Sequence, residues 1–382
     1  MMLEKLHAID WQSLNASQMA IWIEDLISTN EAKRKRAGAK LLEGLGEHAE
    51  ALGNVEEYGE ILSSNAPILA TPFFVELLTM PEAPAKGIIL NILGVLAGYK
   101  IKKGLGSIHI SRAEEIYRII LQSFDLYVPY LNADDAYTRI EAMYLFSQFD
   151  EKLSFVIEII LDQLEKDKES DELGKLCASE IIFKKTQLDK TLASHFSERF
   201  TTVLRSWIVS AQSSISVKAQ AALYVITLCG NTIEKSVIKL LSNILKIPDD
   251  FSLLLPLFAE CVDAFIQFGI NRCTSILLDI FDNQTDLLQI FDTAVVLLAI
   301  HFGADDYHMI RATNYGMSEN TEIIVQTETP INPIEFPLNE VQIDVLNHLL
   351  IKDELWNIDT NLFKIFHLPT SKSELQTLIV KG

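Results

Sequence analysis

Hydrophobic positions recur along the chain with the period of an α-helix, in units that short polar segments separate. Each unit opens with a loop rich in Asp, Asn, Glu, Ser or Pro. A basic residue follows, then a small or aliphatic residue three positions later and a larger apolar residue three positions after that. Side chains at these spacings lie on one face of a helix. The units are Arg36/Ala39/Leu42, Lys86/Ile89/Ile92, Arg139/Ala142/Leu145, Lys175/Ala178/Ile181 and Lys218/Ala221/Tyr224.

The units recur at intervals of roughly 36 to 53 residues, a spacing typical of stacked helical hairpins. The apolar segments Ile68–Leu78 and Phe124–Leu131 precede two of them, and each contains a proline that kinks the helix or marks its first turn. One hairpin cannot bury its apolar stripe alone, whereas a stack makes a continuous core. The pattern therefore favours an all-α repeat protein over the alternative, a globular all-α domain whose helices share a face pattern by chance.

Several segments resemble a known repeat superfamily. Asn132–Phe149 (NADDAYTRIEAMYLFSQF), an acidic loop followed by Arg139 and Ala142, is similar to units of HEAT / phycobilin-lyase-like repeats. This resemblance covers most of residues 20–300. The chain is also similar to a group of bacterial HEAT-like proteins, on the strings Ala70–Leu78 (ATPFFVELL), Gln342–Leu346, Leu355–Trp356 and Leu368–Pro369.

The resemblance implies a right-handed α-solenoid of HEAT-like hairpins that serves as a binding scaffold, with an immunity or accessory role in some relatives. It carries over no catalytic residue. On this view residues 1–250 form the repeat array, and residues 251–382 continue the solenoid less regularly. The second part is expected to hold a long loop at 303–337 and two capping helices, Leu338–Ile351 and Ser373–Val380. In the loop, Glu322–Thr327 (EIIVQT) has the alternation of a short strand or hairpin arm.

Charge narrows the range of partners. The chain of 382 residues has a formal net charge of -20, with 52 acidic against 32 basic residues. A protein that binds phosphate backbones needs clustered Lys and Arg, so the balance argues against nucleic acid and against an anionic membrane surface. Residues 251–382 carry about -12 of this charge. A basic protein is therefore the expected partner, because complementary charge speeds encounter and sets specificity.

The candidate partner-binding face is acidic. Asp279, Asp282 and Asp286 cluster at one predicted helix–helix turn, and Asp305 and Asp306 follow at the next helix end on the same side of the array. Alternate turns of a solenoid lie on one rim, so these five residues are expected to form one patch. The alternative is a solvated surface that keeps the protein soluble.

Motifs that carry chemistry are weak in this sequence. The run Lys33–Arg36 (KRKR) is expected to be the exposed first turn of a repeat helix more than a nucleic-acid contact. Gly104–Gly106 lacks the context of a phosphate loop, and His48 and His308 have acidic neighbours without metal-site spacing. We therefore expect no catalytic residue, no metal and no cofactor. The four cysteines form no CxxC pair and are expected to be free thiols.

Two carboxylates, Asp263 and Asp292, lie inside strongly apolar segments, where each must find a partner or face a groove. The leading hypothesis is a cytoplasmic, non-enzymatic repeat protein that binds a basic protein, as an immunity or antitoxin-like neutraliser would. We expect no signal peptide at the start of the chain. The alternatives are a lyase-type or cofactor-handling enzyme with a pocket near Asp263, Asp292 and loop 303–337, and an assembly scaffold with several partners. The sequence leaves the oligomeric state open.

Overall fold

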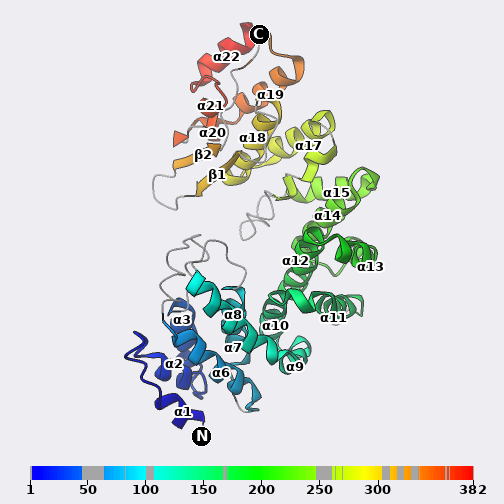
Figure 1. The fold of residues 1–382 in the computed structure, drawn as a ribbon. Helices are drawn as coiled ribbons and strands as arrows, with labels where there is room; N and C mark the ends of the chain where they lie inside the picture. The colour runs from blue at the N-terminus through cyan, green and yellow to red at the C-terminus, as the bar shows by residue number, and fades with distance from the viewer. Residues whose placement is uncertain are drawn as a thin grey trace. The chain divides into compact units, whose positions relative to one another are not determined.

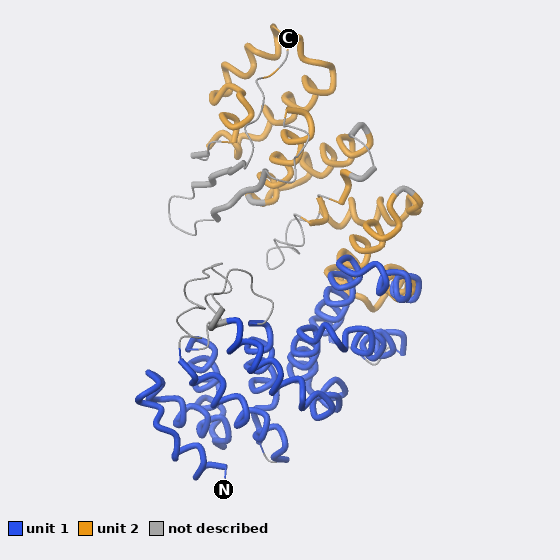
Figure 2. The backbone as a smooth tube through the Cα atoms, viewed as in Figure 1, with its two compact units in different colours: residues 1–200 blue, residues 201–382 orange. Residues whose placement is uncertain are grey.

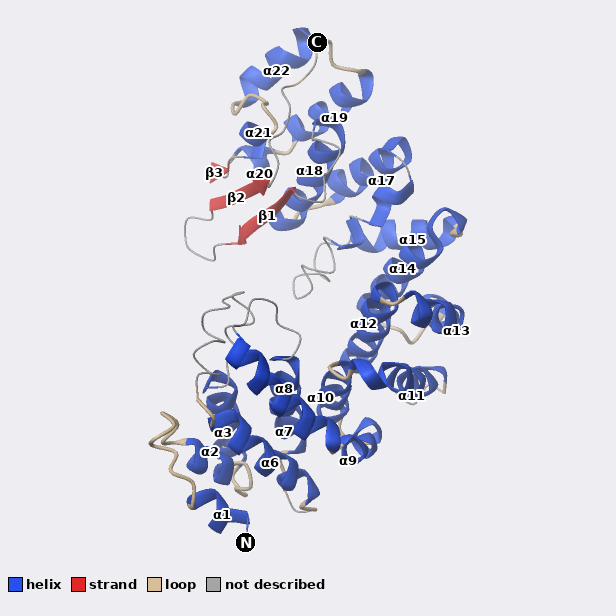
Figure 3. Cartoon of the chain, viewed as in Figure 1, coloured by secondary structure: helices blue, strands red, loops and turns tan. Residues whose placement is uncertain are grey.

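Helices dominate this chain (Figure 3), which confirms the all-α class. The computed structural model describes residues 2–44, 64–81, 83–99, 107–166, 169, 171–246, 260–262, 264–268, 270–302, 310–315, 322–327, 334, 336–357, 359–360 and 362–381. Internal contacts divide the chain into two compact units, residues 1–200 and 201–382 (Figure 2). The sequence predicts that the regular repeats end at residue 250. This boundary concerns the repeat pattern, not compact units, and it stays a prediction.

The first unit is a succession of helices and short turns (Figure 1). The α-helices are α1 (Met2–His7), α2 (Met19–Asp25), α3 (Glu31–Gly44), α6 (Ala66–Thr79), α7 (Lys86–Gly98), α8 (Ser107–Gln122), α9 (Phe124–Tyr127), α10 (Ala136–Ser147), α11 (Leu153–Glu165), α12 (Glu172–Leu188) and α13 (Lys190–Val209), which runs into the second unit. Two 3-10 turns, η2 (Val128–Asn132) and η3 (Asp150–Lys152), precede α10 and α11.

The helices that carry the first four repeat units pack in sequence order. α3 contacts α7, α7 contacts α10, and α10 contacts α12, although other helices intervene in the chain between each pair. The intervening helices pack beside this row, α6 against α7 and α11 against both α10 and α12. The repeated apolar positions are the reason, because the middle residues Ile89, Ala142 and Ala178 are completely buried.

Helices α7 and α10 approach closely because two glycines face two tyrosine rings. A Cβ atom added at Gly87 would lie 2.5 Å from a ring carbon of Tyr137, and one added at Gly94 would lie 2.5 Å from a ring carbon of Tyr144. Both pairs are separated by two helical turns, so the contact repeats along one side of each helix. A larger side chain at Gly87 or Gly94 would push the tyrosine ring or the whole helix α10 away from α7.

Polar residues at the start of the repeat helices satisfy backbone groups. Side chains before α3, α10, α12 and α14 accept a backbone N–H of the first turn, and these are Asn30, Asp135, Asp171 and Ser214. The basic residue of a unit then holds carbonyls of the preceding segment. Nζ of Lys86 donates to Leu78 O and Met80 O at 2.8 and 2.5 Å, and Nη1 of Arg139 donates to Ala133 O at 2.7 Å. In these two units the basic residue supplies donors that carbonyls near a helix end need.

The register predicted for the first unit, Arg36/Ala39/Leu42, is wrong by one or two residues. Ala39 is exposed and Leu42 is half-buried, whereas Ala37 and Leu41 are in the core. Four consecutive basic residues precede this helix face, so spacing from a basic residue alone does not select the register.

Aromatic rings fill the space between α9, α10 and the start of α11. Phe124 packs edge-on against Phe146 with ring centroids 5.0 Å apart, and Tyr127 stacks on Phe149 at 6.4 Å. The hydroxyl of Tyr127 donates to Ile120 O at 3.1 Å, which satisfies its one polar group inside the core. The segment Phe124–Leu131, expected as one helix interrupted by Pro129, is instead the short helix α9 followed by η2, which has Pro129 in its first turn.

The second unit contains helices and a sheet. Its elements are α14 (Ile215–Cys229), η4 (Gly230–Thr232), α15 (Lys235–Leu245), η5 (Phe265–Phe268), α17 (Ile270–Asn283), α18 (Leu287–Phe302), β1 (Ile310–Tyr315), β2 (Glu322–Thr327), α19 (Glu340–Ile351), α20 (Asp353–Trp356), β3 (Asp359–Thr360), α21 (Leu362–Ile365) and α22 (Lys372–Lys381). α14 packs on α15, α15 on α17, α17 on α18, and α18 on α19. The two helices predicted near the C-terminus are confirmed as α19 and α22.

The segment 303–337, predicted as one long loop, contains two strands in its described part. β1 pairs antiparallel with β2, from Ile310 opposite Thr327 to Tyr315 opposite Ile323. The strand predicted at 322–327 is therefore confirmed. β2 also pairs in parallel with β3, and β1 contacts α18, so this segment is tied to the helices of its unit. Sequence pattern identified β2 but not β1, whose residues IRATNY lack clear alternation.

His301 links three helices of the second unit. Its Nε2 lies 2.7 Å from Oγ1 of Thr274 on α17, and its backbone oxygen accepts from Nε2 of Gln342 on α19 at 2.8 Å. Burial lowers the pKa of His301 below its usual value of 6.5, because the charged ring is poorly solvated there.

We expect Gly94→Ala to lower the free energy of unfolding by about 1–3 kcal/mol, since the new methyl group collides with the Tyr144 ring. Urea unfolding measures the loss. Gly44→Ala is the matched control, because its Cβ would lie 3.6 Å from the Trp22 ring, an ordinary contact. A stable Gly94→Ala variant would contradict the close approach of α7 and α10.

We expect the second unit to lose stability as the pH falls below about 6.5. The unfolded chain then binds a proton at residue 301, whereas the folded chain, whose His301 pKa is lowered, does not. Above the pKa of this histidine in the unfolded chain, the contribution of His301 to the free energy of unfolding is fully retained. Thermal unfolding between pH 7.5 and 5 measures the slope, and His301→Gln should flatten it. His195→Gln, at an exposed position, serves as the control. If it flattens the pH dependence of the unfolding temperature as much as His301→Gln does, His301 is not the cause.

Candidate functional site

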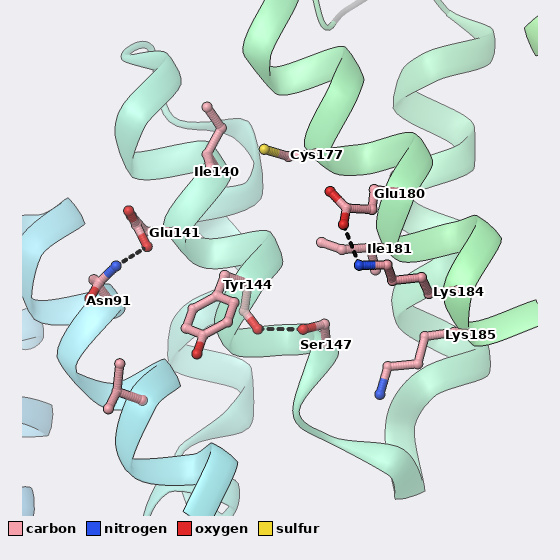
Figure 4. A pocket seen from close by; sticks show the side chains of 11 residues that line it. Asn91, Ile140, Glu141, Tyr144, Ser147, Cys177, Glu180, Ile181, Lys184 and Lys185 are labelled. Carbon is pink, nitrogen blue, oxygen red and sulfur yellow. Dashed lines mark hydrogen bonds and ion pairs between the residues drawn. The ribbon is translucent and has the colours of Figure 1, made fainter. Parts of the chain in front are cut away.

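A groove runs across the row of repeat helices in the first unit (Figure 4). Its volume is about 460 Å³, within the range of about 300–1,000 Å³ typical of ligand pockets. We call it the α7–α10–α12 groove, and its lining residues are Asn91, Val95, Ile140, Glu141, Tyr144, Ser147, Cys177, Glu180, Ile181, Lys184 and Lys185. Each of the three helices contributes residues, so the groove crosses three repeat units.

Helical periodicity positions these side chains. On α10, Ile140, Tyr144 and Ser147 follow at intervals of four and three residues, and so share one face. On α12, Cys177, Ile181 and Lys184 do the same. This face adjoins the buried one that carries Ala142 and Ala178. Ile181, predicted to share the buried face with Ala178, is half-buried and lines the groove instead.

One end of the groove presents hydrogen-bond acceptors. Glu141 is nine-tenths buried, and its Oε2 accepts from Nδ2 of Asn91 at 2.6 Å. Oδ1 of Asn91 is buried and has no hydrogen-bond partner among the residues that the structure describes. The carboxylate of Glu141 and the amide oxygen of Asn91 therefore lie together on α10 and α7 (Figure 4).

The other end presents two lysines that already form ion pairs. Nζ of Lys184 lies 2.5 Å from Oε1 of Glu180 one turn away on α12, and Nζ of Lys185 lies 3.5 Å from Oδ1 of Asp150. Glu180 therefore lies at the lysine end of the groove, and Tyr144 and Ile181 lie between this end and Glu141 (Figure 4).

Cys177 lies in the groove as a protonated thiol. Burial first, and then the nearby carboxylates of Glu180 and Glu141, raise its pKa to about 11. A nucleophilic cysteine needs the opposite environment, in which positive charge lowers the pKa. Cys177 is thus unsuited to nucleophilic catalysis at neutral pH.

No family model, curated protein or solved structure matches this chain. The resemblance to HEAT-like repeats therefore stays a hypothesis, and the site has to be interpreted from its own geometry.

The predicted acidic face is only partly described, and its described members take part in helix contacts. Asp279 pairs with Lys246, Asp282 lies 2.8 Å from Nδ1 of His348, and Oδ1 of Asp286 accepts from the backbone N–H at the start of α18. Asp305 and Asp306 lie outside the described residues. The role of this face in binding stays a prediction, but three of its five acids also stabilise the fold.

Other residues singled out from the sequence are placed as follows. Asp292 is buried within α18, while Asp263, His48, His308 and Gly104–Gly106 lie outside the described residues. The basic run is in the first turns of α3, as expected. There Lys33 and Lys35 pair with Asp25 and Glu31, and Arg34 donates to a backbone oxygen.

Within the described part of the chain, no three His, Cys, Asp or Glu side chains are arranged to hold a metal ion. None of the described helices combines the length and apolar character needed to cross a membrane. All four cysteines are free thiols, as predicted.

Sequence reasoning did not identify the α7–α10–α12 groove. Its residues come from segments about 40 to 90 positions apart, and the repeat pattern drew attention to the buried face instead. One signal was available. Glu141 is an acid next to the buried Ala142 in the middle of a repeat helix, where a solvated carboxylate is not expected.

A buried ion pair fixes the helices that form the groove. Arg139, at the start of α10, donates from Nε and Nη2 to both oxygens of Glu169, each at 2.8 Å. Glu169 is almost completely buried just before α12, and it also accepts the backbone N–H of Asp171. This two-bond geometry sets how the starts of α10 and α12 align.

We expect Arg139→Ala to cost about 3–5 kcal/mol of unfolding free energy, because it leaves the Glu169 carboxylate buried without its ion pair. Arg139→Lys should recover part of this but lose the two-bond geometry. Lys166→Ala breaks an exposed pair with Asp162 and should cost less than about 1 kcal/mol. Equal effects of the Arg139 and Lys166 variants in urea unfolding would contradict this assignment.

Proposed function

We propose that this chain is a non-enzymatic helical-repeat protein that binds a protein partner across its row of repeat helices. Its hairpins, in this proposal, form a right-handed α-solenoid of the HEAT type. The α7–α10–α12 groove carries the proposal, because it crosses three repeat units on the side of each helix that the core does not use. Stacked repeats present surfaces of this kind for extended recognition.

The lining of the groove favours binding over catalysis. Its cysteine is held protonated, its lysines are engaged in ion pairs, and its walls are aliphatic and aromatic. The carboxylates near Cys177 raise its pKa, so the thiol is not activated as covalent catalysis needs. A groove with apolar walls and a few oriented polar groups is suited to side chains of a partner.

A second, smaller pocket is less suited to this role. It has a volume of about 330 Å³ at the first turns of α3, α7 and α10. Lys86, Arg34 and Tyr130, which line it, already donate to backbone oxygens of the fold. Its polar groups are therefore occupied in holding the loops between hairpins.

The expected partner is basic. The chain has a net charge of -20, and the groove itself places Glu141 and Glu180 beside its apolar walls. An immunity or antitoxin-like neutraliser of a basic protein is the form of this function that we favour, acting in the cytoplasm. Opposite charge increases the association rate and selects among partners.

The test is capture of a partner by tagged protein from a lysate of the source cells. We expect one stoichiometric partner with the unmodified chain and at least tenfold less with Ile181→Arg, which places a bulky cation in the groove. Leu173→Arg is the matched control, because Leu173 is exposed on the same helix outside the groove. Both variants must keep the unfolding temperature of the parent protein.

Two results would overturn the proposal. One is the absence of any stoichiometric partner, and the other is equal capture by the Ile181 and Leu173 variants. Charge reversal of Asp279, Asp282, Asp286, Asp305 and Asp306 provides a further arm. If it abolishes capture while Ile181→Arg does not, the partner binds at the acidic face and not in the groove.

A further inference from the structure

The acceptor end of the α7–α10–α12 groove defines the chemistry of its occupant. Glu141 contributes a carboxylate that is nine-tenths buried, and Asn91 contributes a buried amide oxygen without a hydrogen-bond partner among the described residues. Acceptors held out of water are costly unless a donor reaches them. The group that fits is one with several donors and no acceptor.

Charge around the groove selects a cation among such groups. Burial raises the pKa of Cys177, and the carboxylates of Glu180, Glu141, Asp171 and Glu169 act in the same direction. Glu141 is the charged group at the acceptor end, and Lys184 and Lys185 lie away from it (Figure 4). Each of these lysines already pairs with an acid.

Shape and packing favour a planar cation. Tyr144 lines the groove between the two ends, and its ring is held against α7 by the absence of a side chain at Gly94. A guanidinium has several donors in one plane and stacks on aromatic rings, whereas an ammonium is a compact and strongly hydrated charge. The aliphatic stem of an arginine would contact Ile140 and Ile181, which line the same groove.

We propose that the groove seats an arginine side chain from an extended segment of the protein partner, with its guanidinium donating to Glu141 and Asn91 and flanking aliphatic residues against Ile140 and Ile181. This inference rests on the proposed function and adds the chemical identity of the bound segment. A volume of about 460 Å³ holds a few side chains of such a segment and not a folded element.

The first test measures binding of fluorescein-labelled nonapeptide libraries by fluorescence anisotropy. Their central residue is arginine, and the other positions are an equal mixture of Ala, Val, Leu and Ser. Matched libraries carry citrulline, the neutral isostere of arginine, or glutamate at the centre. We expect the arginine library to bind about tenfold or more tightly than the citrulline library, the ratio expected for hydrogen bonds to charged groups.

The variant Glu141→Gln should remove this preference for arginine. Glu114→Gln is the matched control, since Glu114 is exposed on α8 and makes the same change of charge outside the groove. A preference that survives Glu141→Gln would overturn the proposal, and so would equal binding of the arginine and citrulline libraries.

A second test uses the unmodified protein and needs no variant to fold. Cys177 lines the groove and Cys229 lies at the end of α14, and both are half-buried free thiols. Mass spectrometry measures the rate at which N-ethylmaleimide alkylates each thiol. The bound arginine library should lower the rate at Cys177 and leave the rate at Cys229 unchanged. Equal rates at Cys177 with and without peptide would place the peptide elsewhere and overturn the assignment.

A free amine is the remaining alternative occupant. If spermidine protects Cys177 at the concentrations at which the arginine library does, the groove is an amine site and the peptide assignment is overturned. The proposed function and this inference fail in different ways. Loss of partner capture in Ile181→Arg without any arginine preference would refute this inference alone, whereas equal capture by Ile181→Arg and Leu173→Arg would refute the proposed function.

Discussion

The close contact between α7 and α10 is the constraint on which the first unit depends. Gly87 and Gly94 leave room for the rings of Tyr137 and Tyr144, so the two helices pack with no side chain of α7 between them at these points. Burial of the neighbouring apolar positions, such as Ile89 and Ala142, follows from this approach. The same contact holds Tyr144 at the edge of the groove, so packing and the candidate site depend on the same residues.

Much of the charge of this protein serves its fold. Arg199 on α13 is held by Glu158, Asp162 and Glu165 of α11, at 2.7 to 3.0 Å. Acids also cap helices and pair with lysines in the second unit. These acids are engaged within the fold, so net charge alone does not locate a binding site, and an acid buried beside a groove is the more specific indication.

The repeated basic residue illustrates how a sequence motif acquires its meaning. In the sequence it precedes the apolar positions of each unit at a fixed spacing. In the structure Lys86 and Arg139 donate to carbonyls of the preceding loop, and Arg139 also holds the buried Glu169. At these two positions the basic residue connects its helix to the preceding segment, because helix ends leave carbonyls that need donors.

The sequence by itself determined the helical class, the helices α19 and α22, the strand β2 and the buried middle residues of four repeat units. These features depend on periodicity over a few turns, which is local. It did not determine the register of the first unit, where four consecutive basic residues precede the helix, or the strand β1, which pairs with residues further along the chain.

Only the tertiary structure decided where a site could lie. Asn91, Glu141 and Cys177 come from three helices far apart in the chain, and nothing local brings them together. Their meeting depends on how closely α7, α10 and α12 stack, which the glycine–tyrosine contacts and the Arg139–Glu169 pair set. Helix formation is encoded over short distances, whereas a groove between helices depends on contacts that the chain makes only after it has folded.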